Sequence, residues 1–373
     1  PPDWVAFPRS ESDIADLMEF AAKSGAAIVP FGGGTSVCGG VEPDVGDGYR
    51  AAISLDLQYL NRVLEVDTVS RAALIQAGAL GPELEAELRP HGLTLRHFPQ
   101  SFEFSTLGGW IATRAGGHFA SVYTHIDDLV EATRMVTPEG VIESRRLPGS
   151  GAGPSADRMV LGSEGTLGVI TQAWMRLQHR PVHRGSASVT FPSMPDAVAA
   201  VRALSQSGLY PTNCRLLDPA EVAFNGLGDG TSPIVVLGFE SADHPLDAWL
   251  TRALEIAKEF RGSFDAEAAK RSLQGASGSG DAEHLRGASG AWRNSFLRMP
   301  YWRNLTTPLG LIVDTFESAI PWSRFDDFYE GVRDRVGRSI EEVTGQKTTI
   351  SCRFTHIYPD GPAPYFTFVA VGT

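Results

Sequence analysis

The sequence is poor in several features that mark common classes of protein. Among its 373 residues are three cysteines, Cys38, Cys214 and Cys352, with no C-x-x-C pair and no zinc-type spacing. We therefore expect reduced thiols in a cytoplasmic protein. The 44 acidic residues outnumber the 32 basic ones, giving a formal net charge of −12. Nucleic-acid-binding proteins usually present a basic face, so no nucleic-acid partner is expected. No apolar run approaches the roughly 20 residues of a membrane-spanning helix.

Familiar signatures of nucleotide sites and of hydrolases are also missing. A G-x-G-x-x-G fingerprint would need glycine where Val37 stands, and no Gly-Lys-Ser/Thr follows the glycines as a Walker loop requires. No nucleophile elbow accompanies a Ser-His-Asp set. Asp314 and Glu317 are expected on opposite faces of one strand, which does not suit a pair of catalytic carboxylates. His118 and His125 lack further clustered ligands, so no metal is expected.

The most distinctive stretch that is present runs from Ile28 to Gly40. A short apolar run enters a loop with five glycines in nine residues. Glycine lets the backbone pass close to a ligand, and successive loop N–H groups can form a concavity suited to anionic oxygens. The stretch therefore favours a pyrophosphate cradle, with a turn that is merely rich in glycine as the alternative.

Two later segments have the same small-residue character. In the segment from Phe98 to Gly117, Ser105 or Thr106 is a candidate cap for a helix whose N-terminus faces an anion. A helix of small residues packed closely on a sheet explains the same glycines. The segment from Gly162 to Ile170 is a third loop that runs into a strand. Three such loops in one domain can converge on one elongated ligand.

The order of helices and strands suggests two domains, residues 1–180 and 181–373, joined by a linker over 179–184. Helical spacing after Ser10 and a strand over 26–31 place the first glycine loop behind a helix–strand unit. The second domain alternates strands and helices without a dinucleotide signature, which suggests an antiparallel α+β sheet. Residues 266–291 are expected to be a flexible excursion. Both ends of the chain are expected to be cut from something longer.

Alternation in two predicted strands, 348–358 and 365–370, places basic and phenolic side chains together. If Phe354 and Phe366 face the core, Arg353 and Tyr365 point to the opposite side of the sheet. Arg215 has the same relation to its apolar neighbours. The space that these side chains face is either a site or solvent, and a hydrogen-bonded boundary tyrosine is the alternative for Tyr365.

A further group of arginines lies among aromatic residues between Trp292 and Asn304. It includes Arg303. The planar guanidinium fork suits phosphate or carboxylate, so the group is a candidate anion pocket. Surface arginines that extend along apolar neighbours are the alternative.

Four motifs, in this order, carry a resemblance to a known family. They are PFGGGTS at Pro30–Ser36, PQSFEFST at Pro99–Thr106, GGWIATRA at Gly108–Ala115 and GSEGTLGVI at Gly162–Ile170. The chain resembles the vanillyl-alcohol-oxidase-type flavoproteins, and within them it is most similar to the alkyldihydroxyacetonephosphate synthase group. The resemblance implies an α+β chain with a PCMH-type FAD-binding domain over 1–180 and an antiparallel-sheet cap, or substrate, domain over 181–373.

The resemblance also implies the cofactor and the residues that hold it. Many relatives attach flavin to a histidine in the glycine loop, whereas this loop reads Gly34-Thr35-Ser36, so FAD is expected to be bound without a covalent link. The expected FAD-binding residues are Pro30, Gly32, Gly33, Gly34, Thr35, Ser36, Pro99, Ser101, Ser105, Thr106, Gly109, Thr113, Arg114, Gly116, Glu164, Gly165, Gly168, Val169 and Ile170.

The activity implied by the resemblance belongs to ether-lipid synthesis. The acyl group of acyl-dihydroxyacetone phosphate is exchanged for a fatty alcohol without net redox change. By position, Tyr365 matches the family's proton-handling tyrosine, Arg303 its phosphate-binding arginine and Arg215 an arginine required for activity. Arg353 is the third substrate-binding candidate. A cytoplasmic location is expected, and peripheral contact with a membrane and a homodimer are left open.

Two other functions are kept as alternatives. One is an FAD-dependent dehydrogenase or oxidase of 2-hydroxy acids of the lactate or glycolate type, in which arginines would hold a carboxylate. The other is a flavin-fold remnant without catalysis. Its support is that the family carries a triple-histidine motif in a returning C-terminal segment, whereas this chain has no His-His pair and that segment is expected to be missing from it.

Overall fold

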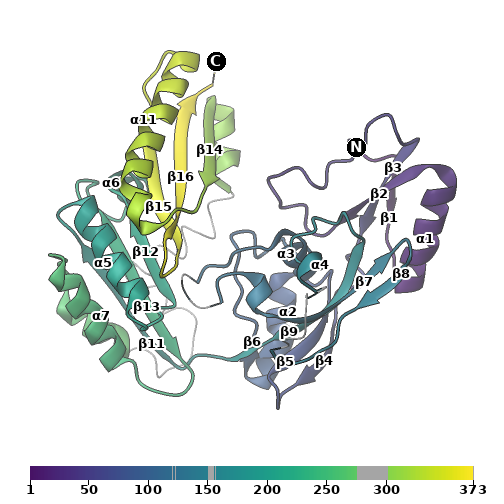
Figure 1. Cartoon of the computed structure of the whole chain (residues 1–373), viewed down its shortest axis with the longest axis horizontal. Helices are drawn as coiled ribbons and strands as arrows, with labels where there is room; N and C mark the ends of the chain where they lie inside the picture. The colour runs from purple at the N-terminus through teal and green to yellow at the C-terminus, as the bar shows by residue number, and fades with distance from the viewer. Residues whose placement is uncertain (120, 122, 150–154, 156, 275–300, 373) are drawn as a thin grey trace. The chain divides into compact units, whose positions relative to one another are not determined.

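A computed structural model describes residues 1–119, 121, 123–149, 155, 157–274 and 301–372 (Figure 1). The chain divides into two compact units. Unit 1 comprises Pro1–Gly117 and His125–Arg180, and unit 2 comprises His118–Thr124 and Pro181–Thr373. The short segment His118–Thr124 therefore leaves unit 1, packs with unit 2 and returns.

Unit 1 combines a parallel sheet with a larger antiparallel one. The parallel sheet has the strand order β1-β3-β2, and the antiparallel sheet has the order β4-β5-β9-β7-β8. A separate short antiparallel pair, β6 with β10, completes the strands of unit 1. The elements of unit 1 are β1 (Trp4–Ala6), α1 (Glu11–Ser24), β2 (Ala26–Phe31), β3 (Ala51–Asp56), β4 (Val63–Asp67), β5 (Ala72–Gln76), α2 (Gly81–Leu88), η1 (Arg89–His91), β6 (Leu93–Thr94), α3 (Leu107–Thr113), η2 (Ile126–Asp128), β7 (Val130–Thr137), β8 (Gly140–Glu143), α4 (Asp157–Val160), β9 (Val169–Arg176) and β10 (Gln178–His179).

The first helix begins and ends where its sequence predicts. Ser10 is the N-cap, and its side chain and that of Asp13 form a reciprocal capping box. Gly25 ends the helix with φ 72°, a left-handed conformation that glycine adopts without a steric cost. The chain then turns directly into β2, so the end of α1 fixes where the glycine loop after Phe31 starts.

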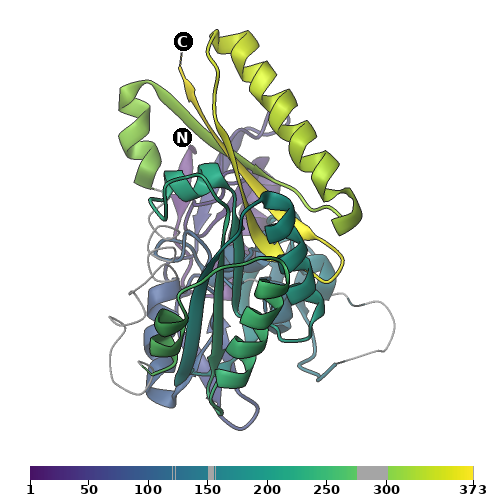
Figure 2. The ribbon, with the colours of Figure 1, turned by 90° about the vertical axis from the view of Figure 1, so that its left-hand side faces the viewer.

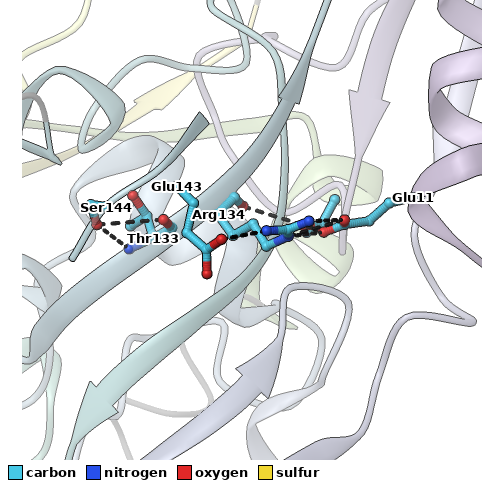
Figure 3. A network of polar contacts seen from close by, with 6 residues as sticks. Glu11, Thr133, Arg134, Glu143 and Ser144 are labelled. Atoms are coloured by element: carbon cyan, nitrogen blue, oxygen red, sulfur yellow. Dashed lines mark hydrogen bonds and ion pairs between the residues drawn. The ribbon is translucent and has the colours of Figure 1, made fainter. Parts of the chain in front are cut away.

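An ion pair ties α1 to the antiparallel sheet of unit 1 (Figure 3). Arg134 on β7 donates from Nε and Nη2 to the two carboxylate oxygens of Glu11, each at 2.9 Å, and Thr171 on β9 adds a hydroxyl bond of 2.6 Å. Arg134 also pairs with Glu143 on β8. Because α1 is followed at once by β2, this network holds the parallel sheet against the antiparallel one.

We predict that Glu11→Gln lowers the free energy of unfolding by about 1 kcal/mol at pH 7, since a charge-assisted bidentate contact is lost. Burial raises the pKa of Glu11, but hydrogen bonds from Arg134 and Thr171 outweigh it, so the net pKa lies below the ordinary 4.5. The contribution is therefore present above pH 4.5 and is lost as pH falls. Urea unfolding at pH 7 and pH 3.5 measures it. The matched control is Glu19→Gln, which breaks the exposed pair with Lys23 and should cost little. Equal losses in the two variants would contradict the prediction.

Unit 2 is built on one antiparallel sheet with the order β11-β13-β12-β15-β16-β14. Helices α5, α7 and α11 lie along one face of this sheet (Figure 2). The elements are β11 (His183–Thr190), α5 (Met194–Gln206), β12 (Asn213–Leu217), α6 (Pro219–Phe224), β13 (Ile234–Ser241), α7 (Asp247–Glu259), α8 (Ala266–Gln274), α10 (Trp302–Thr306), η6 (Thr307–Leu309), β14 (Leu311–Glu317), η7 (Trp322–Arg324), α11 (Phe325–Thr344), β15 (Ile350–Ile357) and β16 (Pro362–Val371). The predicted antiparallel α+β sheet is confirmed.

Two sequence-based predictions about unit 2 and its entry were wrong in part, although the boundary between the units, at Arg180 and Pro181, does fall inside the expected linker. Within the expected linker 179–184, His179 belongs to β10, and β11 starts at His183. The expected flexible excursion 266–291 begins with the helix α8. Ser272 on α8 accepts a hydrogen bond from the Ser186 backbone N–H and donates to its carbonyl, both at 2.9 Å, so contact with β11 stabilises a helix that composition did not predict. Residues 275–291 lie outside the described residues.

Candidate flavin and substrate site

In unit 1 the first glycine loop lies directly against the segment that precedes α3. A Cβ added at Gly32 would overlap the Thr106 hydroxyl oxygen, and one added at Gly33 would overlap the carbonyl oxygen of Phe104. Because only hydrogen fits at these positions, the close approach of two backbones requires glycine. Two motifs that are about 70 residues apart in sequence therefore form one surface.

The third small-residue loop joins the same surface. The N–H groups of Gly162 and Glu164 donate to the carbonyls of Ile111 and Ala112 on α3, at 3.0 and 2.9 Å. A Cβ at Gly165 would lie 3.2 Å from the Pro30 ring, at the end of β2. The three loops that the sequence singled out thus lie together within unit 1.

The helix α3 combines both interpretations of its sequence. Thr106 is its N-cap and accepts from the N–H of Gly109 at 3.3 Å, so Thr106 rather than Ser105 caps the helix. Gly108 lies where a Cβ would come within 2.7 Å of the Ala77 side chain, which is close packing on β5 and the loop after it. Ser105 accepts from the Trp110 indole N–H at 2.7 Å, so its hydroxyl orients a buried ring.

The side chains of three predicted cofactor residues are already engaged within unit 1: that of Arg114 in an ion pair, and those of Val169 and Ile170 in the apolar core. Arg114 ends α3 at φ 51° and pairs with Asp127 at 2.9 Å, and Arg158 pairs with the same carboxylate at 3.1 Å. Val169 and Ile170 are buried in the core of unit 1. Contact between these two residues and a cofactor would therefore come from their backbone.

The other predicted cofactor residues lie along the same stretches. Ser101 is the carbonyl acceptor of the turn ahead of α3, bonded to the Phe104 N–H at 2.9 Å, and Thr113 donates to the Gly109 carbonyl at 3.0 Å. Gly116 forms an isolated bridge with His125, and Gly168 has φ 153°. Pro99, Gly34, Thr35 and Ser36 complete the loops. The result is a strip lined by backbone and small side chains, which fits the pyrophosphate of a dinucleotide cofactor such as FAD.

One buried residue beside this strip was missed by the sequence analysis. His97 is 1% exposed, its ring lies 5.2 Å from that of Trp110, and neither ring nitrogen has a hydrogen-bond partner among the described residues. Burial, with a contribution from His125, lowers the pKa of His97 to about 3, so the ring is neutral. Its position just before the motif that starts at Pro99 is the signal that could have found it.

We predict that His97 makes the fold sensitive to acid. The folded-state pKa of about 3 lies below the ordinary 6.5, so the unfolded chain takes up the proton first and stability falls as pH drops below 6.5. Between pH 7.5 and 5, the wild type should lose about 2 kcal/mol relative to His97→Leu. Urea unfolding of the FAD-free protein measures this difference.

The wild type must be compared with His97→Leu because Asp218 changes the pH dependence of stability in the opposite direction. Burial raises the pKa of Asp218 to about 6, which favours the folded state as pH falls toward the ordinary value of 3.8. Asp218 is the same in both proteins, so its effect cancels. The exposed His91 supplies the control variant, His91→Leu. A pH dependence of His97→Leu equal to that of the wild type would contradict the prediction.

In unit 2 the polar face of the sheet gathers the predicted arginine and tyrosine. Arg353 on β15 lies directly opposite Tyr365 on β16, and its guanidinium carbon is 4.0 Å from the centre of the Tyr365 ring. Cys352, Phe354 and Phe366 are buried in the apolar core on the other face. The predicted separation of the two faces is thus what the structure has.

Arg215 occupies the same face and is fully buried. Its Nη2 donates to the carbonyl oxygen of His118 at 2.5 Å, so it binds the segment that crosses from unit 1. Burial, followed by the charge of Arg353, lowers the pKa of Arg215 to about 9, which leaves it charged at neutral pH. Arg303 lies on α10, and its side chain is outside the described residues.

A short helix that the sequence analysis did not predict supports this face. Asp218 caps α6, and Pro219 occupies its first turn. Glu221, on the same helix, accepts from Arg353 Nη1 at 2.8 Å, and Asp218 accepts from the Tyr329 hydroxyl at 3.0 Å. The sequence Asp-Pro-x-Glu is a recognisable helix start and could have found α6, but it does not reveal which arginine Glu221 meets.

Among the described residues, no helix has the length and apolar character needed to cross a membrane. The same residues hold no group of three or more His, Cys, Asp and Glu side chains suited to a metal ion.

Comparison with known proteins gives the family. Residues 2–144 match a family model described as an FAD binding domain, and residues 180–371 match one described as the C-terminal domain of FAD linked oxidases. The chain is 31% identical over 376 residues to an alkyldihydroxyacetonephosphate synthase of Trypanosoma brucei brucei, covering 99% of this chain and 61% of the relative. It is 32% identical over 231 residues to a cytochrome-type mitochondrial D-lactate dehydrogenase of Arabidopsis thaliana, covering 61% of this chain and 40% of the relative.

This chain is also similar to solved structures of flavoproteins. An alkyldihydroxyacetonephosphate synthase structure matches with a TM-score of 0.83 and 28% identity, covering 99% of this chain and 68% of the other. A p-cresol methylhydroxylase structure matches with a TM-score of 0.71 and 14% identity, covering 98% and 74%, which supports the PCMH-type fold alone. The predicted fold, resemblance and FAD cofactor are confirmed. The chain spans about 61% of the length of the curated synthases, to which it is similar over nearly all of its own length. Its match to the two family models over residues 2–144 and 180–371 shows that it belongs to the FAD-linked oxidase family.

Proposed function

We propose that this protein is an FAD-dependent enzyme that exchanges the acyl group of acyl-dihydroxyacetone phosphate for a fatty alcohol. The observation that carries the proposal is similarity to the synthases over 99% of the chain. In the exchange, the bond between the glycerone carbon and the acyl oxygen breaks, fatty acid leaves, and the alcohol oxygen bonds to the same carbon. The hydroxyl proton of the alcohol balances the released acid, so no net oxidation occurs.

Each proposed residue has one task. Tyr365 transfers a proton at the reacting carbon through its phenol oxygen, because its phenol lies on the polar face beside Arg353. Arg303 binds the substrate phosphate through its guanidinium fork. Arg215 and Arg353 supply two buried positive charges on that face, which would favour an anionic substrate. The backbone strip at Gly32, Gly33 and Gly165 holds the FAD pyrophosphate, and bound FAD supplies the electron-accepting ring system that the exchange requires.

We further propose that FAD is bound without a covalent link, because Thr35 and Ser36 stand where many relatives carry a histidine. A flavin absorption band that passes a filter after denaturation would support this. A band that stays with the denatured chain would contradict it.

The lipid character of both substrates supports peripheral contact with a membrane. A cytoplasmic location and a homodimer are proposed from the resemblance to the synthase group. Flotation with phospholipid vesicles and sedimentation equilibrium test the membrane contact and the homodimer separately. Protein that stays at the bottom of the gradient, or a monomer mass at micromolar concentration, would contradict the respective proposal.

The second candidate function is oxidation of a 2-hydroxy acid, favoured by the 32% identity to a D-lactate dehydrogenase over 231 residues. The two functions differ in net redox change. Anaerobic addition of D-lactate or glycolate should leave the flavin absorption of this protein unchanged if the exchange proposal is right. Loss of the flavin absorption within the time of one catalytic turnover would favour the dehydrogenase function. A purified protein that neither retains nor takes up FAD would favour a non-catalytic remnant.

A further inference from the structure

A buried carboxylate stands behind the proposed proton-transfer residue. Glu221 on α6 is fully buried, and both of its oxygens are occupied. Oε1 accepts from Arg353 Nη1 at 2.8 Å, and Oε2 accepts from the Ser351 hydroxyl at 2.6 Å. Since Arg353 is 1% exposed, the pair is shielded from water, and a shielded pair of charges interacts far more strongly than one at the surface.

The partner of this carboxylate touches Tyr365. The Arg353 guanidinium lies over the Tyr365 ring at 4.0 Å, within the range of a favourable cation–π contact. The two residues are directly opposite each other in the β15–β16 register. Glu221 therefore fixes the guanidinium through one nitrogen, and the guanidinium in turn fixes the face of the ring.

We infer that Glu221 is a positioning residue, which acts through Arg353 to hold Tyr365 in the orientation and charge environment used for proton transfer. This inference rests on the proposed function of Tyr365. Glu221 is not itself a catalytic residue, because its oxygens are taken up by Arg353 and Ser351.

The charges on this face give the sign of the expected effect. Among the described side chains, Arg215 and Arg353 are the cations on this face, and Arg215 is bonded to the carbonyl of His118. The neighbouring carboxylates among the described residues are Glu221 on α6, Asp218 at the N-cap of α6, which accepts from Tyr329, and Glu317 on β14. Glu317 lies opposite Tyr365 and accepts from Thr355. Neutralising Glu221 removes the negative charge that Arg353 contacts through Nη1. A more positive surrounding favours loss of the phenol proton at lower pH.

The first test is Glu221→Gln in the FAD-loaded full-length protein, since glutamine keeps the shape and an acceptor for Arg353. In the wild type, the part of the pH profile of kcat that reports Tyr365 is the limb that is absent in Tyr365→Phe. In Glu221→Gln this limb should lie about one pH unit lower than in the wild type, and kcat at neutral pH should change several-fold. Arg353→Met should move the same limb to higher pH. The double variant should behave like Arg353→Met, because Glu221 has nothing left to act through. Asp196→Asn, which breaks an ion pair with Arg261 elsewhere in unit 2, should leave the limb in place.

A second readout needs no substrate. Protein labelled with carbon-13 at the Tyr ζ position gives one signal that disappears in Tyr365→Phe, and Glu221→Gln should shift this signal and its pH response. If the wild type shows no exchange activity but the Tyr365 signal shifts in Glu221→Gln, the proposed function fails and the positioning by Glu221 stands. If exchange occurs while limb and signal are unchanged in folded Glu221→Gln, the inference is overturned. Should Glu221→Gln not fold, an unmoved limb and signal in Arg353→Met would overturn it equally.

Discussion

Tyr365→Phe is expected to lower kcat of the exchange reaction by about 10²–10⁴-fold, the usual contribution of a positioned acid or base. Phenylalanine keeps the ring that packs under Arg353 and removes only the hydroxyl through which the proton would pass. The Michaelis constant should change little, because the arginines that are proposed to bind the substrate remain. Steady-state kinetics with acyl-dihydroxyacetone phosphate and a fatty alcohol measure both constants.

The control for this variant is Tyr210→Phe, at an exposed tyrosine in the same unit. It should leave kcat unchanged, and both variants should unfold within about 0.5 kcal/mol of the wild type. A Tyr365→Phe protein with full activity would remove the proposed proton transfer from this residue. A loss of activity that follows a loss of stability would mean that the hydroxyl is structural.

Gly33→Ala is expected to abolish stable FAD binding. The added Cβ would overlap the carbonyl oxygen of Phe104 and would lie 2.9 Å from Cα of Ser105. These are backbone atoms, which cannot rotate away as a side chain does, so one of the two loops must move. We expect a loss of about 3 kcal/mol in folding stability and at least about 100-fold in FAD affinity, since contacts to a phosphate depend on backbone N–H geometry.

Titration of the FAD-free protein by quenching of flavin fluorescence measures this affinity. Gly48→Ala is the matched control, because a Cβ at Gly48 meets nothing within 4 Å, and it should bind FAD like the wild type. Gly33→Ala protein with one tightly held FAD would show that the first glycine loop is needed for neither packing nor cofactor.

Features set by neighbouring residues could be predicted from the sequence. Ser10 and Gly25 delimit α1 because caps act within one turn. Alternation along β15 and β16 placed Arg353 and Tyr365 on one face because the side-chain period of a strand is two. The order of the four flavin motifs predicted the family, since each motif is a continuous stretch.

Features that depend on distant contacts could not be predicted in the same way. Helix α8 has few large apolar residues, and its contact with β11 through Ser272 and Ser186 joins residues 86 positions apart. The Glu221–Arg353 pair spans 132 positions, so neither propensity nor spacing reveals it. Arg215 was placed on the correct face, but the backbone carbonyl of His118 as its partner became visible only in the folded chain.

The central claim is the exchange itself, and the most direct measurement uses labelled alcohol. Full-length FAD-loaded protein is mixed with acyl-dihydroxyacetone phosphate and radiolabelled hexadecanol, and the label in alkyl-dihydroxyacetone phosphate is compared with the fatty acid released. The account predicts equal amounts of both products, formed without an added electron acceptor. Release of fatty acid without incorporation of the label, or product formation only with an electron acceptor, would contradict it.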